Sequence, residues 1–163
     1  MKDLPEHKLV FVVEDNEMYS LMLEYTVFTD SVIKCMCFKT AEECIQNIGL
    51  NPILVILDYW LPGMNGKEAF KKIKEIDPLI PVIILTRNHD AVVKEELMES
   101  GLYAYLQKEQ NSVPQVKAVV NVILEKINKG QYRTLRNVKR AVYILLFIAS
   151  SLAILWIVKN GKP

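Results

Sequence analysis

The sequence lacks an excess of charge of either sign. Its 163 residues include 20 Lys and Arg against 19 Asp and Glu, which gives a formal net charge of +1. Proteins that bind nucleic acid through bulk electrostatics need a basic excess on one face to neutralise phosphates. The composition therefore argues against a direct nucleic-acid partner.

Cysteine and histidine are also scarce. Three cysteines stand at positions 35, 37 and 44 without a Cys-x-x-Cys pair, and His7 and His89 have no ligand-spaced partners. The odd number of cysteines argues against a disulfide framework and favours a reducing compartment. Because Cys35 and Cys37 stand two apart in an apolar run, we expect them to share one face of a strand and to pack as small hydrophobic side chains. Metal binding through these cysteines is a minor alternative.

The N-terminus lacks the pattern of an export signal. Residues 1–8 are polar and include Pro5, and the apolar stretch that follows is short and ends at Glu14. A secretory signal needs a longer apolar region. We therefore expect the N-terminal domain to remain in the cytoplasm.

Five short apolar runs alternate with five longer amphipathic segments. Continuous apolar runs of this length are typical of strands buried on both faces, and their alternation with helices predicts an α/β fold with a doubly wound, five-stranded parallel sheet. Lys34 and Gln107 in the second and fifth runs indicate more exposed strands. The predicted strands cover 9–13, 32–38, 53–57, 81–85 and 103–107, and the predicted helices cover 18–28, 41–48, 67–76, 91–100 and 113–128.

Polar side chains follow four of the five predicted strands. Glu14 and Asp15 follow the first strand, Asp58 the third, Thr86 the fourth and Lys108 the fifth. Any one of them is equally well explained as a turn or cap residue. Their joint occurrence indicates a binding site, because open α/β sheets bind ligands beyond the carboxyl ends of their strands. Three convergent carboxylates need a cation, and Mg²⁺ suits oxygen ligands. A carboxylate beside Mg²⁺ is a nucleophile toward phosphoryl groups, whose oxygens a lysine and a threonine can contact.

These residues, together with the segment 58–66 (Asp-Tyr-Trp-Leu-Pro-Gly-Met-Asn-Gly), resemble the receiver domain of bacterial two-component response regulators over about residues 7–129. The resemblance implies a flavodoxin-like fold in which Asp58 accepts a phosphoryl group from a histidine kinase. It also implies that Glu14, Asp15, Asp58 and the backbone carbonyl of Trp60 ligate Mg²⁺.

The same resemblance implies a switch. In the family the threonine, here Thr86, turns toward the phosphoryl oxygens and the aromatic residue, here Tyr105, follows it. The face formed by the last two helices and the strand between them then changes shape for an effector protein. Such a chain is a phosphoacceptor signalling domain and not an enzyme, with at most Mg²⁺-dependent self-phosphorylation and self-dephosphorylation.

Three positions depart from the family pattern or flank it with unusual bulk. Glu109 follows Lys108 where many members have proline, and Arg87 follows Thr86 where a small residue is usual. Trp60 is bulky enough to shield an acyl phosphate from water. These positions bear on the lifetime of the phosphorylated state.

The C-terminal region contains an uncharged apolar run over residues 141–158. As a helix it would be about 27 Å long, close to the thickness of the hydrocarbon core of a bilayer. We therefore predict a transmembrane helix, with a buried core helix or an oligomerisation helix as the alternatives. The chain then divides into a receiver over 1–130, a basic juxtamembrane linker over 131–140, the span, and a short tail over 159–163.

The charges that flank this run predict its orientation. Four basic residues precede it and two follow it, and the side richer in Lys and Arg is normally cytoplasmic. This places the receiver at the cytoplasmic face of the inner membrane, where the linker can contact anionic lipid. The basic residues are Arg133, Arg136, Lys139 and Arg140 before the run, and Lys159 and Lys162 after it.

Three functions are compatible with these features. The first is a membrane-tethered response-regulator receiver that takes its phosphoryl group from a sensor histidine kinase and signals through protein contacts. The second is a phosphorelay intermediate or phosphate sink, in which a phosphotransfer protein is the partner. The third is an interaction module that no longer needs phosphate, which the complete acidic set disfavours.

Overall fold

The computed structural model describes residues 8–28, 33–88, 90–109, 112–129, 138 and 141–151. They belong to two compact units, Met1–Val120 and Asn121–Pro163. His7, His89, most of the predicted linker and residues 152–163 lie outside the described residues. The predictions for those positions stay predictions.

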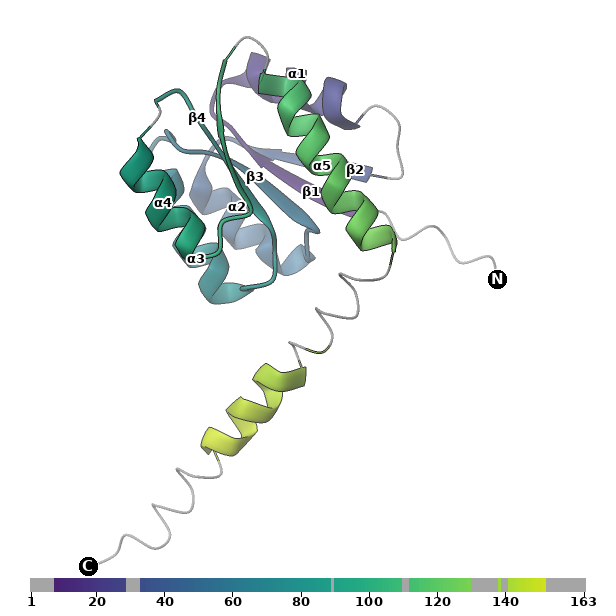
Figure 1. The fold of residues 1–163 in the computed structure, drawn as a ribbon, viewed down its shortest axis with the longest axis vertical. Helices are drawn as coiled ribbons and strands as arrows, with labels where there is room; N and C mark the ends of the chain where they lie inside the picture. Colours follow the sequence, from purple (N-terminus) through teal and green to yellow (C-terminus); the bar gives the residue numbers. More distant parts are fainter. Residues whose placement is uncertain are drawn as a thin grey trace, which may run out of the picture. The chain divides into compact units, whose positions relative to one another are not determined.

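The first unit contains a five-stranded parallel sheet in the order β2-β1-β3-β4-β5 (Figure 1). This order is the flavodoxin-like variant of the doubly wound fold, so the predicted five-stranded α/β fold of this unit is confirmed. The strands are β1 (Lys8–Val13), β2 (Ile33–Phe38), β3 (Leu54–Asp58), β4 (Val82–Thr86) and β5 (Ala104–Gln107). The three central strands are almost wholly buried, whereas β2 and β5 are the partly exposed edges, as Lys34 and Gln107 indicate.

Helices cover both faces of the sheet. Side chains of β1, β3 and β4 alternate between the faces, and one set forms a core with α2, α3 and α4 that includes Phe11, Leu57, Phe70 and Leu97. On the other face lies α1, with Leu23 and Val27 buried (Figure 1). The helices are α1 (Glu17–Phe28), α2 (Ala41–Asn47), α3 (Gly66–Ile76), α4 (Ala91–Glu99) and α5 (Ser112–Asn128), with the short 3₁₀ helix η1 (Ile48–Leu50) after α2.

Local signals in the sequence account for where several helices begin and end. The Thr40 hydroxyl accepts a hydrogen bond from the Glu43 N–H at 3.2 Å, as an N-cap should, but the Glu43 carboxylate bonds to the Lys39 N–H and not to that of Thr40. The reciprocal capping box that the spacing of Thr40 and Glu43 favours is therefore only half formed. Gly101 has a positive φ of 90° just after α4, as is typical of a glycine that ends a helix.

The second unit contains a helix over residues 141–151, inside the predicted span. From Val142 to Ile148 its apolar side chains are exposed, each by 48% or more. Within the residues that the structure describes, no helix has the combined length and apolarity needed to cross a membrane. Residues 152–158 of the predicted span lie beyond the described part of the chain.

Candidate phosphoacceptor site

The site is built around a lysine whose side chain is buried between two buried carboxylates. The Lys108 ammonium lies 2.6 Å from Glu14 Oε2 and 2.6 Å from Asp58 Oδ2. Glu14 and Asp58 are each 2% exposed, whereas Asp15 beside them is exposed. The carboxyl ends of β1 and β3 and the residue after β5 thus meet at one edge of the sheet, as predicted.

Burial and like charge make this arrangement costly without a cation. Burial raises the pKa of Glu14, the hydrogen bond from Lys108 opposes this shift, and the nearby charge of Asp58 adds to it. An unpaired buried carboxylate is strongly disfavoured. In this structure, Lys108 provides the compensating charge for both buried carboxylates.

Glu14, Asp15 and Asp58 also fit a divalent metal ion. Each offers one carboxylate oxygen, and the three oxygens lie within 4.8 Å of one another. We call these three residues the acidic cluster. Hard oxygen ligands in this number, with Asp15 open to solvent, are suited to Mg²⁺, which usually retains several waters.

The loop after β3 holds Asp58 in place. Its Oδ1 accepts a hydrogen bond from the Trp60 N–H at 3.1 Å, so both carboxylate oxygens of Asp58 have a partner. Gly66 begins α3 against the end of β3, where an added Cβ would lie 2.5 Å from the Asp58 carbonyl oxygen. Only glycine fits there. Asn65 and Glu68 form a complete capping box that fixes the start of α3.

A second anchor of this loop comes from α2. The Met64 N–H donates to Glu42 Oε1 at 3.0 Å. Nothing in the sequence distinguished Glu42 from the other acidic residues of its helix. This contact joins two segments that lie far apart along the chain.

Thr86 and Tyr105 lie together on neighbouring strands. Thr86 is 1% exposed, and its hydroxyl donates to the Asn88 carbonyl at 3.0 Å and accepts from the Asn88 N–H at 3.3 Å. Burial raises the pKa of Tyr105, and the nearby Thr86 side chain opposes the shift. The structure therefore places the two predicted switch residues near one another on adjacent strands.

Tyr19 of α1 is a neighbour of the site that the sequence did not reveal. The Lys108 ammonium lies 4.7 Å from the centre of its ring, within the range of a cation–π interaction. The Tyr19 hydroxyl lies 2.9 Å from the hydroxyl of Ser112, a buried residue at the start of α5. Tyr19 thus covers Lys108 and connects it to another helix.

The unusual residues near the site have exposed side chains. They are Arg87 and Glu109, which depart from the family pattern, and the bulky Trp60. The Trp60 ring packs edge-to-face on that of Tyr59, with 5.3 Å between the ring centres. None of the three side chains takes part in the buried cluster around Lys108.

Comparison with known proteins agrees with this geometry. The family model described as response regulator receiver domain matches residues 10–121. The chain is 28% identical over 101 residues to the DNA-binding transcriptional regulator NtrC of Klebsiella pneumoniae, a match that covers 61% of this chain and 21% of that protein. It is 28% identical over 123 residues to the protein-glutamate methylesterase/protein-glutamine glutaminase of Bacillus licheniformis, covering 72% of this chain and 34% of that protein. The chain therefore spans only a minor part of these relatives.

Solved structures match the same region. The signal receiver domain of a Luxo repressor protein from Vibrio parahaemolyticus is 26% identical, with a TM-score of 0.70, and the match covers 77% of this chain and 95% of that one. A BeF3-activated DrrB receiver domain is 27% identical, with a TM-score of 0.64, over 72% of this chain and 97% of that one. Both similarities cover nearly the whole of the matched structure.

Proposed function

We propose, because the chain belongs to the response regulator receiver domain family, that Asp58 accepts a phosphoryl group from a sensor histidine kinase. The observation that supports this best is the buried Lys108 between Glu14 and Asp58, with Asp15 exposed beside them. Receiver domains partner with histidine kinases, and the acidic cluster is typical of their phosphoacceptor sites.

The proposed reaction uses the carboxylate of Asp58 as the nucleophile. One of its oxygens forms a bond to phosphorus while the phosphorus–nitrogen bond of the donor histidine breaks, and the imidazole keeps that electron pair. When bound by the acidic cluster and the Trp60 carbonyl, Mg²⁺ would neutralise charge on the phosphoryl oxygens. Lys108 already contacts Asp58 and would follow the transferred group as a counter-charge.

The proposed output is a rearrangement on the β4–β5 side of the sheet. The Thr86 hydroxyl is now hydrogen-bonded to the backbone of Asn88 and lies near the Tyr105 side chain. Phosphoryl oxygens on Asp58 would compete for that hydroxyl, and Tyr105 would lose this neighbour when Thr86 turns. An effector protein that contacts α4, β5 and α5 would sense this change.

The proposed site of action is the cytoplasmic surface of the inner membrane. Residues 141–158 carry no charge, and within them the helix exposes its apolar side chains from Val142 to Ile148. Exposed apolar side chains all round a helix are costly in water and favourable in lipid. A tether would raise the effective concentration of the receiver near a membrane-bound kinase.

The phosphorylation test uses the full chain in detergent with Mg²⁺ and a small acyl-phosphate donor. The expected product is an acid-stable, base-labile phosphoryl group on one residue, absent from Asp58→Ala. Equal labelling of Asp58→Ala, or no labelling of the unaltered chain, would contradict the proposal. Asp77→Ala is the matched control, because this carboxylate lies at the end of α3, outside the cluster.

A second experiment separates a switch from a phosphorelay intermediate. Once Asp58 is labelled, partner binding is compared with and without phosphate. Binding that depends on phosphate and on Thr86 supports the switch. Rapid transfer to a histidine phosphotransfer protein, with no change in other contacts, would support the relay.

A further inference from the structure

A pair of cysteines lies at the edge of the sheet, away from the phosphoacceptor site. Cys35 and Cys37 occupy alternate positions on β2, and their sulfur atoms are 3.8 Å apart. The two side chains share one face of the strand, as predicted. The prediction that both pack as hydrophobic side chains is wrong for Cys37, because Cys37 is exposed, and Cys35 is only partly buried. The third cysteine, Cys44, belongs to α2 and is buried in the hydrophobic core.

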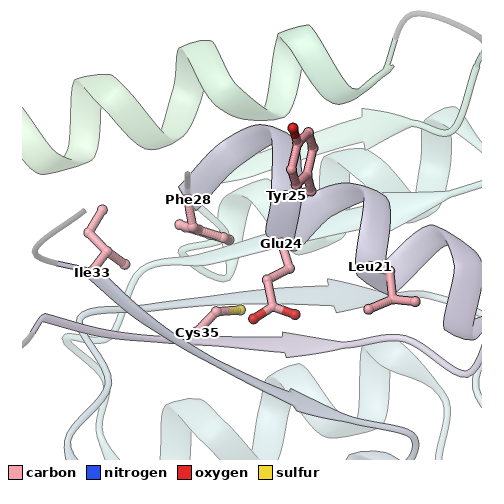
Figure 2. A pocket seen from close by; sticks show the side chains of 6 residues that line it. All are labelled: Leu21, Glu24, Tyr25, Phe28, Ile33 and Cys35. Atoms are coloured by element: carbon pink, nitrogen blue, oxygen red, sulfur yellow. The ribbon is translucent and has the colours of Figure 1, made fainter. Parts of the chain in front are cut away.

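Polar groups of α1 face this pair. Cys35 lines a cavity of about 360 Å³ between α1 and β2, and in Figure 2 the Glu24 carboxylate in that cavity points toward the Cys35 sulfur. Ser20, one turn before Glu24 on α1, also lies on this side of the helix and contributes to lowering the pKa of the Cys37 thiol. The remaining lining residues are apolar: Leu21, Tyr25, Phe28 and Ile33.

These contacts give the two thiols different character. The hydrogen bond with Cys35, together with the nearby Ser20 hydroxyl and against some burial, lowers the pKa of Cys37 to about 7. The shared hydrogen bond, with burial, raises the pKa of Cys35. The deprotonated thiolate is the form of cysteine that binds metals and reacts with electrophiles. Cys37 is therefore the thiol of the pair that deprotonates first as the pH rises.

We infer that Cys35, Cys37 and Glu24 form a binding site for one thiophilic divalent cation, with Zn²⁺ as the reference ion and water as the fourth ligand. Two sulfurs bound to Zn²⁺ at about 2.3 Å with a tetrahedral angle lie about 3.8 Å apart. The observed sulfur separation of 3.8 Å already matches this value. The thiols can thus share an ion without movement of the strand.

The proposed site also requires the Glu24 carboxylate to move. The acidic cluster is the one set of three potential ligands in the described residues whose atoms already lie within 4.8 Å of one another, so the Glu24 carboxylate must rotate toward the sulfurs. Glu24 is exposed, which allows this rotation. The two sites differ in chemistry, because thiolates select soft ions and the acidic cluster offers only hard oxygens.

An intramolecular disulfide fits the same pair less well. Two positions apart on an extended strand, the Cβ atoms are separated by about 6 to 7 Å, whereas a disulfide needs about 3.5 to 4.5 Å. Its formation would bend β2 away from β1, with which β2 is paired along its whole length. A bridging metal ion spans the pair without that distortion.

The test uses the full chain, reduced with a phosphine, in detergent with excess Mg²⁺ to occupy the acidic cluster. Cd²⁺ serves as the probe, because its bonds to thiolates absorb in the ultraviolet, and Zn²⁺ is then added as a competitor. We expect one Cd²⁺ per chain, displaced by Zn²⁺. Cys35→Ser and Cys37→Ser should each weaken binding by more than about tenfold, the lower end of the range for loss of a supporting group.

Matched variants and a second measurement complete the test. Cys44→Ser should keep the affinity of the unaltered chain, and Glu24→Gln should weaken binding while retaining the thiolate absorption. Cd²⁺ should also slow alkylation of Cys35 and Cys37 in the unaltered chain, which needs no variant to fold. The proposed site would be overturned if Cys37→Ser bound Cd²⁺ as tightly as the unaltered chain, if only half an ion bound per chain, or if Cd²⁺ gave no protection from alkylation. Full affinity in Glu24→Gln would show that Glu24 is not a ligand of the site.

Discussion

At the scale of single residues, the site depends on one glycine as well as on its charged groups. Gly66 lets the start of α3 approach the end of β3, where Asp58 lies. A Cβ at this position would be 2.5 Å from the Asp58 carbonyl oxygen and 2.7 Å from the Tyr59 Cα. These neighbours are backbone atoms, so they cannot turn aside as a flexible side chain would.

We predict that Gly66→Ala destabilises the protein by about 1 to 3 kcal/mol, the usual cost of an overpacked position. It should also slow phosphorylation of Asp58, because the backbone that carries this residue must shift. Urea denaturation and acyl-phosphate labelling measure the two effects. Gly49→Ala is the control, since nothing lies within 4 Å of its added Cβ, and equal behaviour of the two variants would contradict the prediction.

Loss of Lys108 should make the stability of the protein depend more strongly on metal binding by the acidic cluster. Lys108→Met would leave Glu14 and Asp58 buried together without a counter-charge, and loss of one partner from a buried ion pair costs about 3 to 5 kcal/mol. We predict this loss of unfolding free energy in the presence of a chelator. Because a bound cation stabilises the folded state, Mg²⁺ should restore more stability to Lys108→Met than to the unaltered chain.

Urea denaturation with and without Mg²⁺ measures this difference. Lys71→Met is a suitable control, because the Lys71 side chain is 55% exposed and its ion pair with Glu96 is long, at 3.8 Å. Such a pair contributes little to stability. An equal effect of Mg²⁺ on both variants would argue against metal binding by the acidic cluster.

The charged residues of the site could be predicted, whereas their neighbours could not. Parallel strands place their carboxyl ends at one edge, so Glu14, Asp58 and Lys108 follow from the order of the apolar runs. Tyr19 and Glu42 approach from helices, and their contacts depend on how each helix is rotated over the sheet. Sequence spacing does not determine this rotation closely enough to identify a single contact.

At the scale of secondary-structure elements, Tyr19 joins α1 to the start of α5. Its hydroxyl contacts Ser112, which is buried, and its ring covers the Lys108 ammonium. Through these two contacts, Tyr19 links the buried ion pairs to a helix of the proposed output face. Substitutions at Tyr19 can remove the hydroxyl contact alone or both contacts together.

We predict that Tyr19→Phe costs about 1 kcal/mol of stability through the lost hydrogen bond, and leaves phosphorylation of Asp58 nearly unchanged. Tyr19→Leu also removes the ring above Lys108, and it should alter the rate of phosphorylation or the lifetime of the product. Labelling time courses compare the two variants. If Tyr19→Phe changed the kinetics as much as Tyr19→Leu, the hydroxyl and not the ring would carry the effect.

The elements themselves were predicted more fully than their contacts. Each strand and helix was predicted within a few residues of its observed bounds, because buried strands and amphipathic helices differ in period. The edge strands β2 and β5 were recognisable from Lys34 and Gln107. The exposure of Cys37 could not be recognised, since an apolar run does not reveal which face of the strand a neighbouring helix leaves uncovered.

At the scale of the whole molecule, the proposed tether and the proposed chemistry should be separable. Phosphorylation depends on side chains of the first unit, whereas the membrane proposal depends on residues 141–158. A variant that disrupts only the apolar run should therefore leave Asp58 fully reactive. This separation distinguishes a tether from a helix that is needed for folding.

Leu145→Arg combined with Ile148→Arg tests this expectation. An arginine near the centre of a spanning helix costs about 2.5 to 3.5 kcal/mol on insertion scales, so the double variant should move to the soluble fraction after carbonate extraction while the unaltered chain stays with the membrane. Tyr143→Arg is the matched control, because an arginine near the end of the run can extend its charge to the interface and should remain membrane-bound. Acyl-phosphate labelling of Asp58 should be equal in all three proteins. Release of the unaltered chain by carbonate would contradict the tether, and loss of labelling in the double variant would mean that the helix supports the folded receiver.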